Sequence, residues 1–294
     1  MQSEATWPAL PLEAWRETCD TLHLCTQIVG KIRLALAPPE PEWAHVSLQV
    51  TSRGLTTTAM PLGDRTFAID FDFVRHALDV VVSDGRALSI PLLSRSVAAF
   101  YELLMGALKA LDIDVRIWTM PVEIPQPTRF TEDTIHASYD PLYAHRFWQI
   151  LVQVDSILKE HRAPYRRRHT PVQFFWGTFD LAYTRFSGRP ATPPNESLIM
   201  REAMDSEEIC AGFWPGDERF PEPAFWCYVY PKPAGNIERA NLVPPLAAWN
   251  GTLGEFVLTY EDARTSGSPR RAIRDFFAST YEHCASLANW DAAK

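Results

Sequence analysis

Asp180 is the residue best placed to do chemistry in this sequence, because its carboxylate stands in the middle of an aromatic run that favours a β-strand. The run, residues 170–190, reads TPVQFFWGTFDLAYTRFSGRP. We expect a strand over 171–186 that is apolar on both faces and therefore central in its sheet. A buried, ionised carboxylate costs free energy unless a cation or several donors surround it. Asp180 is therefore either half of a structural ion pair, for which Arg185 is one candidate partner, or a functional carboxylate.

A second group of polar residues follows the 3.6-residue period of a helix expected over 12–36. His23, Gln27 and Lys31 stand at i, i+4 and i+8, opposite the apolar face and beside Gly30. Glycine inside a helix costs about 1 kcal/mol, and exposed stripes usually carry Glu, Lys and Arg. The mixture favours a face that meets another element or a ligand closely, and an ordinary exposed face is the alternative. His23 is a second candidate for acid/base catalysis.

Three cations could orient an anionic group of a substrate. Arg53 lies in SRGLTTT, residues 52–58, whose glycine and threonines also suit an ordinary turn. Lys31 and Arg185 are the other two cations. Arg53 and Lys31 are also alternative ion-pair partners for Asp180.

Aromatic side chains could line the pocket of such a substrate. The chain has 10 Trp among its 294 residues, and Trp176 and Trp214 stand beside Gly or Pro. Pockets lined by aromatic rings are typical of small-molecule sites. Packing in the core or in loops is the alternative, since each ring buries a large area. We take Trp176 and Trp214, together with Gln27 and Gln173, as candidate substrate-binding residues.

The familiar sequence signatures of cofactor sites do not occur. The chain has no GxGxxG, GxxxxGK[ST], HExxH or GxSxG pattern, which leaves nucleotide-binding, zinc-protease and esterase activities without support. Cys19 and His23 could ligate a metal at i, i+4, but no second pair accompanies them. We therefore expect no cofactor and no metal.

Composition narrows the class of partner. The net charge of −8 argues against nucleic acid, because phosphates require a basic surface. No apolar run approaches the length of about 20 residues that spans a bilayer, and the N-terminal residues do not resemble a signal peptide. The five cysteines are scattered and form no CxxC. We expect a cytoplasmic protein with a small-molecule ligand, and the sequence does not decide its oligomeric state.

The predicted elements give an α+β class, because strands come in runs instead of alternating strictly with helices. Helices are expected over 12–36, 94–111, 141–162 and 269–289. Strands are expected over 45–52, 65–73, 77–83, 86–92, 114–119, 171–186, 224–230 and 254–260. A polar, proline-rich excursion over 189–223 is long enough to cover or line a site.

The chain also matches itself at a spacing of 126 residues. This spacing places Gln27 on Gln153, and in both places a helix, an Ala-Pro break and a strand follow one another. We expect two similar halves, 1–125 and 126–294, each with antiparallel strands flanked by helices and together forming one compact unit. An internal duplication would explain the match, and coincidence is the alternative.

Several segments together resemble a known bacterial family, catalogued as domain of unknown function 5996. They are LHLCTQIVGKIRLAL with RGLTT, DVRIWTMPVEIP, PVQFFWGTFDLAYTRFSGR with GFWPG, and EPAFWCYVYP. The resemblance extends from Trp15 to Trp290 and implies a self-contained bacterial cytosolic fold. In that family the position of Gln173 is commonly His and that of Cys25 commonly Trp. The resemblance thus implies that this chain has replaced one potential acid/base or ligand group. The family has no established reaction, so the activity stays open.

Taken together, these observations favour a small-molecule enzyme that uses acid/base chemistry on an anionic or aromatic compound. Its pocket would lie between the two halves and be lined by aromatic rings. A binding protein without turnover, and a structural or adaptor protein whose pocket is filled by side chains, are the alternatives.

Removal of divalent metal should leave the protein unchanged. Because no closed set of Cys or His ligands is visible, dialysis against a chelator should not alter the melting temperature. A fall of several degrees would contradict this expectation and direct attention to Cys19 and His23.

Overall fold

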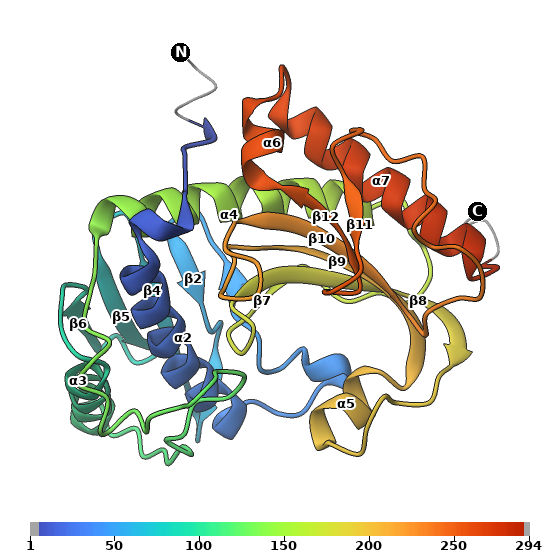
Figure 1. The fold of residues 1–294 in the computed structure, drawn as a ribbon. Helices are drawn as coiled ribbons and strands as arrows, with labels where there is room; N and C mark the ends of the chain where they lie inside the picture. The colour runs from blue at the N-terminus through green and yellow to red at the C-terminus, as the bar shows by residue number, and fades with distance from the viewer. Residues whose placement is uncertain (1–5, 291–294) are drawn as a thin grey trace.

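Two antiparallel sheets form the frame of the molecule in a computed structural model, which describes residues 6–290 (Figure 1). The first sheet has the strand order β1 (Gln49–Val50), β2 (Gly54–Thr56), β4 (Arg65–Asp72), β5 (Ala77–Val82), β6 (Ala87–Pro91), with β3 (Met60–Leu62) paired to β4. The second has the order β11 (Ala248–Asn250), β12 (Glu255–Thr259), β10 (Ala224–Tyr230), β9 (Ser206–Trp214), β8 (Asp180–Pro190), β7 (Gln173–Phe175).

Helices cover the sheets and close each half of the chain. The α-helices are α2 (Arg16–Leu36), α3 (Val97–Ala110), α4 (Pro141–Arg162), α5 (Leu198–Ala203), α6 (Tyr260–Thr265) and α7 (Pro269–Leu287). Short 3-10 helices are η1 (Leu12–Ala14) and η2 (Pro41–Trp43). None of the helices in the described part of the chain is both long and apolar enough to span a membrane.

The two halves are similar, as predicted. Each begins with a long helix, continues with an antiparallel meander and ends with another helix. The spacing of 126 carries α2 to residues 142–162 (16 + 126 and 36 + 126), which coincides with α4. The α+β class and the two-halved architecture are confirmed.

The two sheets join where the halves meet. Leu48 and Phe174 exchange both main-chain hydrogen bonds, each 2.8 Å long. Because 48 + 126 = 174, each residue pairs with its own counterpart, as two elements related by a local twofold axis would. Both side chains are fully buried, and one hydrophobic core contains residues of both halves.

The prediction of a single strand over 171–186 is wrong, because the chain reverses direction in the middle of this segment. β7 ends at Phe175, a tight turn occupies 176–179, and β8 starts at Asp180, which pairs with Phe175. The turn places the bulky Phe179 at a positive φ of 58°, a conformation that its residue type does not signal. Burial of the ring against Phe147, at a centroid distance of 5.2 Å, offsets that strain.

Other boundaries also differ from the sequence-based expectations. Residues 114–119 form no strand, and only Gln49–Val50 of the expected strand 45–52 is one. The excursion 189–223 contains both α5 and β9, so it is part of the sheet and not a loop. Its strand reads SEEICAGFW, which lacks strict alternation because both of its faces are covered.

Replacing Gly30 with alanine should destabilise the protein, whereas the same change at an ordinary helical glycine stabilises it. A Cβ at this position of α2 would overlap the ring of Trp176, whereas a Cβ at Gly106 of α3 would meet nothing. Gly30→Ala should therefore lower the free energy of unfolding by about 1–3 kcal/mol. Gly106→Ala, the matched control, should raise it by roughly 0.5–1 kcal/mol. Urea unfolding of both variants checks the packing, and a stabilised Gly30→Ala would contradict it.

Candidate functional site

The candidate site lies on the face of the second sheet that turns away from α4 and α7. Because side chains alternate along a strand, the paired register assigns this inner face without ambiguity. Its members are Gln173, Phe175, Asp180, Ala182, Thr184, Phe186, Glu208, Cys210, Gly212, Trp214, Ala224, Trp226, Tyr228, Tyr230, Ala248, Asn250, Glu255, Val257 and Thr259. The opposite face carries the large apolar residues that pack on α7, for example Phe225 against Phe277.

Aromatic rings cover the middle of the inner face. The ring of Trp226 lies so close to Gly212 that a Cβ there would overlap it. Trp226 stacks on Tyr228 with a centroid distance of 5.7 Å and an angle of 8° between the rings. Trp214 packs against Phe220 at 5.7 Å. Together with Ala182, Cys210 and their neighbours, these rings form a small apolar cluster separate from the main core.

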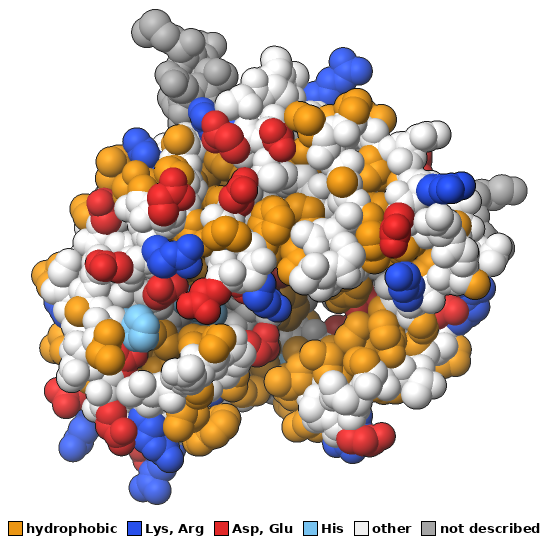
Figure 2. All heavy atoms as spheres, in the orientation of Figure 1, with side chains coloured by type: hydrophobic (Ala, Val, Ile, Leu, Met, Phe, Trp, Pro, Cys, Tyr) orange, Lys and Arg blue, Asp and Glu red, His pale blue; other side chains and the backbone are white. Residues whose placement is uncertain are grey.

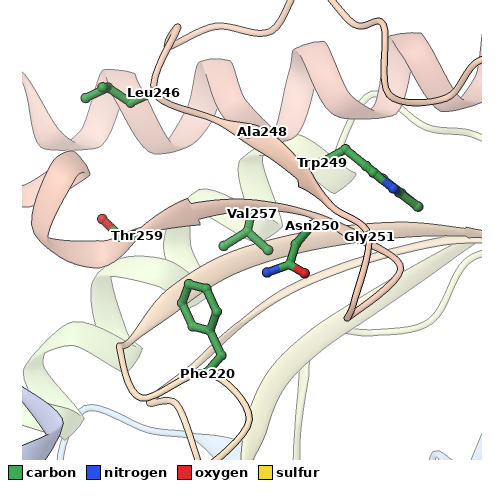
Figure 3. Close-up of a pocket in the computed structure, with 8 residues that line it drawn as sticks. All are labelled: Phe220, Leu246, Ala248, Trp249, Asn250, Gly251, Val257 and Thr259. Carbon is green, nitrogen blue, oxygen red and sulfur yellow. The ribbon is translucent and has the colours of Figure 1, made fainter.

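A pocket of about 410 Å³ opens beside this cluster. Figure 3 shows its wall on β11 and β12, with Phe220 opposite Val257 and the Asn250 amide directed into the space between them. Val257 pairs with Trp226, so the pocket continues the aromatic surface. The remaining lining residues are Leu246, Ala248, Trp249, Gly251 and Thr259. The volume suits a small organic molecule.

Asp180 lies on the inner face with no cation bound to it. Its side chain is 8% exposed and accepts a hydrogen bond from the Thr178 hydroxyl. Burial raises the pKa of Asp180 to about 7, and the charges of Glu123 and Glu255 add to the shift. Since the described residues include no ion-pair partner for this carboxylate, the expectation of a structural ion pair is wrong.

Two further carboxyl groups of the inner face have similarly shifted pKa values. Burial raises the pKa of Glu255 to about 7, although the Arg219 guanidinium lowers it. Burial also raises the pKa of Glu208 to about 7, and its Oε1 accepts a hydrogen bond of 3.0 Å from the Tyr228 hydroxyl. The sheet thus gathers acids that titrate near neutral pH on one aromatic surface.

The entrance to this surface is also acidic. Arg219 pairs with Asp217 at 2.7 Å, and its pKa is raised chiefly by that bond and also by Glu255 and Glu123. Figure 2 shows the molecule hollowed near its middle, with acidic and basic side chains beside the opening and hydrophobic ones along its lower wall. Four carboxyl groups, counting Asp180, therefore share this region with one guanidinium.

The polar residues His23, Gln27 and Lys31 of α2 pack against the region of the β7–β8 turn and are not exposed. His23 Nε2 lies 2.9 Å from the carbonyl oxygen of Gly177, and its ring stacks on Phe179 at 4.9 Å. Gln27 is fully buried and exchanges two hydrogen bonds with the backbone of Val122, at 2.8 and 2.9 Å. The alternative of an ordinary exposed face is therefore wrong.

The environment of His23 and Lys31 changes how each can titrate. Burial lowers the pKa of His23 to about 4, so its imidazole is neutral at pH 7. Burial also lowers the pKa of Lys31 to about 8, and its ammonium lies 4.9 Å from the ring centre of Trp118 and 5.9 Å from that of Trp176. Both residues support the turn that precedes Asp180.

The two arginines predicted for the site lie away from the inner face, whereas Gln173 lies on it. Arg53 binds Asp72 in the first sheet at 2.6 Å. Arg185 points to the opposite face, where its guanidinium lies 4.0 Å from the ring centre of Tyr281 and donates to the His161 carbonyl. Gln173 is the cross-strand neighbour of Ala182 and therefore lies on the inner face, where it is fully buried. It accepts a hydrogen bond of 2.5 Å from Ser47, while its Nε2 has no partner.

The structure therefore places Asp180, Gln173 and Trp214 on one face of the second sheet and Trp176 in the turn before Asp180. Sequence reasoning missed Glu208, Glu255, Arg219 and Trp226. Alternation within GEFVLTY and AFWCYVY could have placed Glu255 and Trp226 on one face of neighbouring strands. Among the residues from 6 to 290, no three His, Cys, Asp or Glu side chains are grouped as metal ligands would be.

Comparison with known families gives one match. A model described as "Family of unknown function (DUF5996)" matches residues 7–294, which is nearly the whole chain. No curated protein and no solved structure is significantly similar to it.

The raised pKa values predict an unusual dependence of stability on pH. Asp180, Glu208 and Glu255 have folded-state pKa values of about 7 and unfolded values of about 4. Their contribution to stability is present below pH 4 and is lost as the pH rises through 7. Asp180→Asn should therefore raise the melting temperature at pH 8 by roughly 5 °C and leave it unchanged at pH 4.

Asp72 provides a control of opposite sign. Burial favours its neutral form, but hydrogen bonds from Arg53, Arg75 and Val74 outweigh burial and hold the pKa of Asp72 well below its usual range. Its contribution is present above the unfolded pKa of about 4 and is lost in stronger acid. Asp72→Asn should lower the melting temperature at pH 8 by several degrees and have little effect in acid. Parallel pH profiles for the two variants would refute the assignment.

Proposed function

This chain belongs to the family of unknown function (DUF5996), and we propose that it binds a small organic molecule on the inner face of the second sheet and acts on it through Asp180. Proton transfer is the proposed chemistry. The observation that carries the proposal is a carboxyl group that is 8% exposed, has no cation bound to it and stands on the aromatic face of a sheet whose strands β11 and β12 line a pocket of about 410 Å³.

The state of Asp180 suits general acid/base catalysis. A group transfers protons best when its pKa lies near the working pH, because both protonation states are then populated. Burial raises the pKa of Asp180 to about 7, which meets this condition. Thr178 donates to one carboxylate oxygen and orients the group, and Trp214 lies on the same face of the neighbouring strand.

Our second candidate, His23, has a supporting part in this proposal instead of a catalytic one. Its Nε2 is engaged with Gly177, its ring is stacked on Phe179, and its pKa of about 4 leaves no proton to give at pH 7. Together with Gln27 it holds the turn that ends at Asp180. Lys31 remains a substrate-binding candidate, because its described contacts are with two aromatic rings and no carboxylate.

A binding protein without turnover is the second candidate function. It is favoured by the state of Cys210, whose thiol lies on the inner face. Burial raises the pKa of that thiol well above its ordinary value and keeps it protonated. The aromatic surface would then serve recognition alone.

The cell compartment and the origin of the two halves are also proposals. A cytoplasmic location is supported by the five cysteines, all of which are free and buried. An internal duplication of a bacterial ancestor is supported by the coincidence of α2 with α4 at the spacing of 126 and by the Leu48–Phe174 pairing.

The test of function uses a mixture of cell metabolites incubated with the purified protein and followed by mass spectrometry. The wild type should deplete at least one compound, and Asp180→Asn should slow that depletion by 100-fold or more, since general acid/base catalysis contributes about 10²–10⁴. Asp70→Asn is the matched control, because Asp70 is a half-buried acid with a raised pKa on the first sheet. It should retain wild-type activity.

The two candidate functions separate in the same experiment. A compound that co-purifies in native mass spectrometry but is never transformed would favour binding without turnover. Equal depletion by the wild type and Asp180→Asn would refute the catalytic role of this carboxyl group.

A further inference from the structure

The charges around the inner face do not match an anionic ligand. The arginines predicted to hold an anion are engaged elsewhere: Arg53 binds Asp72, and Arg185 lies on the far side of the sheet. Lys31 is next to Trp118 and Trp176, and no acid of the inner face contributes to its pKa. Both arginines are therefore in use at other places, and Lys31 of α2 lies beside the rings of Trp118 and Trp176.

The acids of the region, by contrast, outnumber its cations. Asp180 is influenced by Glu123 and Glu255, and Arg219 by Glu255, Glu123 and Asp217. When ionised, these four carboxyl groups and one guanidinium leave a net charge of −3 (1 − 4). Arg219 offsets one of the acids at most, and its side chain is 74% exposed, so it is held loosely.

Aromatic rings and a pocket accompany these charges. Glu255, Val257 and Thr259 alternate on the same face of β12, and the last two line the pocket of about 410 Å³. Trp226 is the cross-strand neighbour of Val257, and Phe220 closes the other side of the pocket (Figure 3). A cation near the face of an aromatic ring gains attraction to its π-electrons in addition to that of a carboxylate.

From this arrangement we infer that the ligand of the inner face is an organic ammonium ion. Its apolar body occupies the pocket between Phe220 and Val257, and its charge lies beside Glu255 on the side toward Asp180. The acids are not grouped as metal ligands in the described part of the chain, so an organic cation fits them better than a metal ion. The inference rests on the proposed function and specifies the class of its ligand.

Binding of such a cation would also change the protonation of the site. A positive charge beside Glu255 and Asp180 favours their ionised forms, so the complex should release protons near pH 7. The groups facing these two acids are Thr178, Glu123 and Arg219. Glu208 lies farther along the face, next to Tyr228, Asp205 and Arg168.

Three probes of similar size test the inference by calorimetry: benzyltrimethylammonium, benzyl alcohol and benzoate. The ammonium probe should bind at least tenfold more tightly than benzyl alcohol, and benzoate should not bind at roughly millimolar concentration. The affinity of the ammonium probe should fall at least tenfold when the pH is lowered from 8 to 5, because the acids of the inner face are protonated at pH 5. Proton release, measured in buffers of different ionisation enthalpy, should accompany binding at pH 7.

Single substitutions test where the positive charge of the bound probe lies. Glu255→Gln should weaken the ammonium probe at least tenfold and leave benzyl alcohol unchanged. Glu160→Gln is the control, since Glu160 is an exposed acid of α4 that pairs with Arg270. It should bind all three probes as the wild type does.

The possible results separate the inference from the proposed function. Equal binding of the three probes, preference for benzoate, no binding of the ammonium probe, or an unaffected Glu255→Gln variant would each overturn the inference. In each of those cases, an Asp180-dependent depletion of a metabolite would still support the proposed catalysis. Conversely, tight binding of the ammonium probe without any Asp180-dependent reaction would support the inferred class of ligand and refute the proposed catalytic role of Asp180.

Discussion

The main-chain pairing of Leu48 with Phe174 is the contact on which the arrangement of the site depends. It joins the first strand of each half and fixes where the second sheet begins. Two residues beyond Phe174, Trp176 donates a hydrogen bond of 2.7 Å to the Val46 carbonyl and lies flat on Gly30. The β7–β8 turn is thereby clamped between the two halves, and the residue that follows it, Asp180, lies on the inner face.

This clamp explains why the acids of the inner face can remain without ion pairs. A carboxylate buried without a cation destabilises the folded state, and the protein gains nothing structural from it. The loss is offset by the extensive aromatic core on the opposite face and by the joined sheets, which keep the geometry fixed. Local destabilisation maintained by a rigid frame is typical of sites selected for binding or chemistry instead of stability.

Much of the fold could be predicted from the sequence, because helix periodicity and the spacing of 126 are local patterns. The long helices and most strands of both halves follow from them. The hairpin at 176–179 could not, since Phe179 adopts a left-handed conformation for reasons of packing. The sequence predicted that Asp180 is buried and so identified it as a candidate site residue. Which residues surround its carboxyl group depends on the β7–β8 turn, which the sequence did not predict. Arg185 and Arg53 were misplaced because the direction of a side chain depends on register, which contacts distant in sequence determine.

Joining the sheets has a further consequence for how the molecule behaves at high concentration. Each sheet taken alone has two end strands in its strand order, and the bridge between Leu48 and Phe174 links one end of each, which leaves two end strands, with β3 paired to β4 outside that order. One of these is β6, which ends in Pro91 and so lacks a donor at that position. The other is β11, only three residues long and followed by Gly251. Both end strands are thus poor templates for amyloid-like growth.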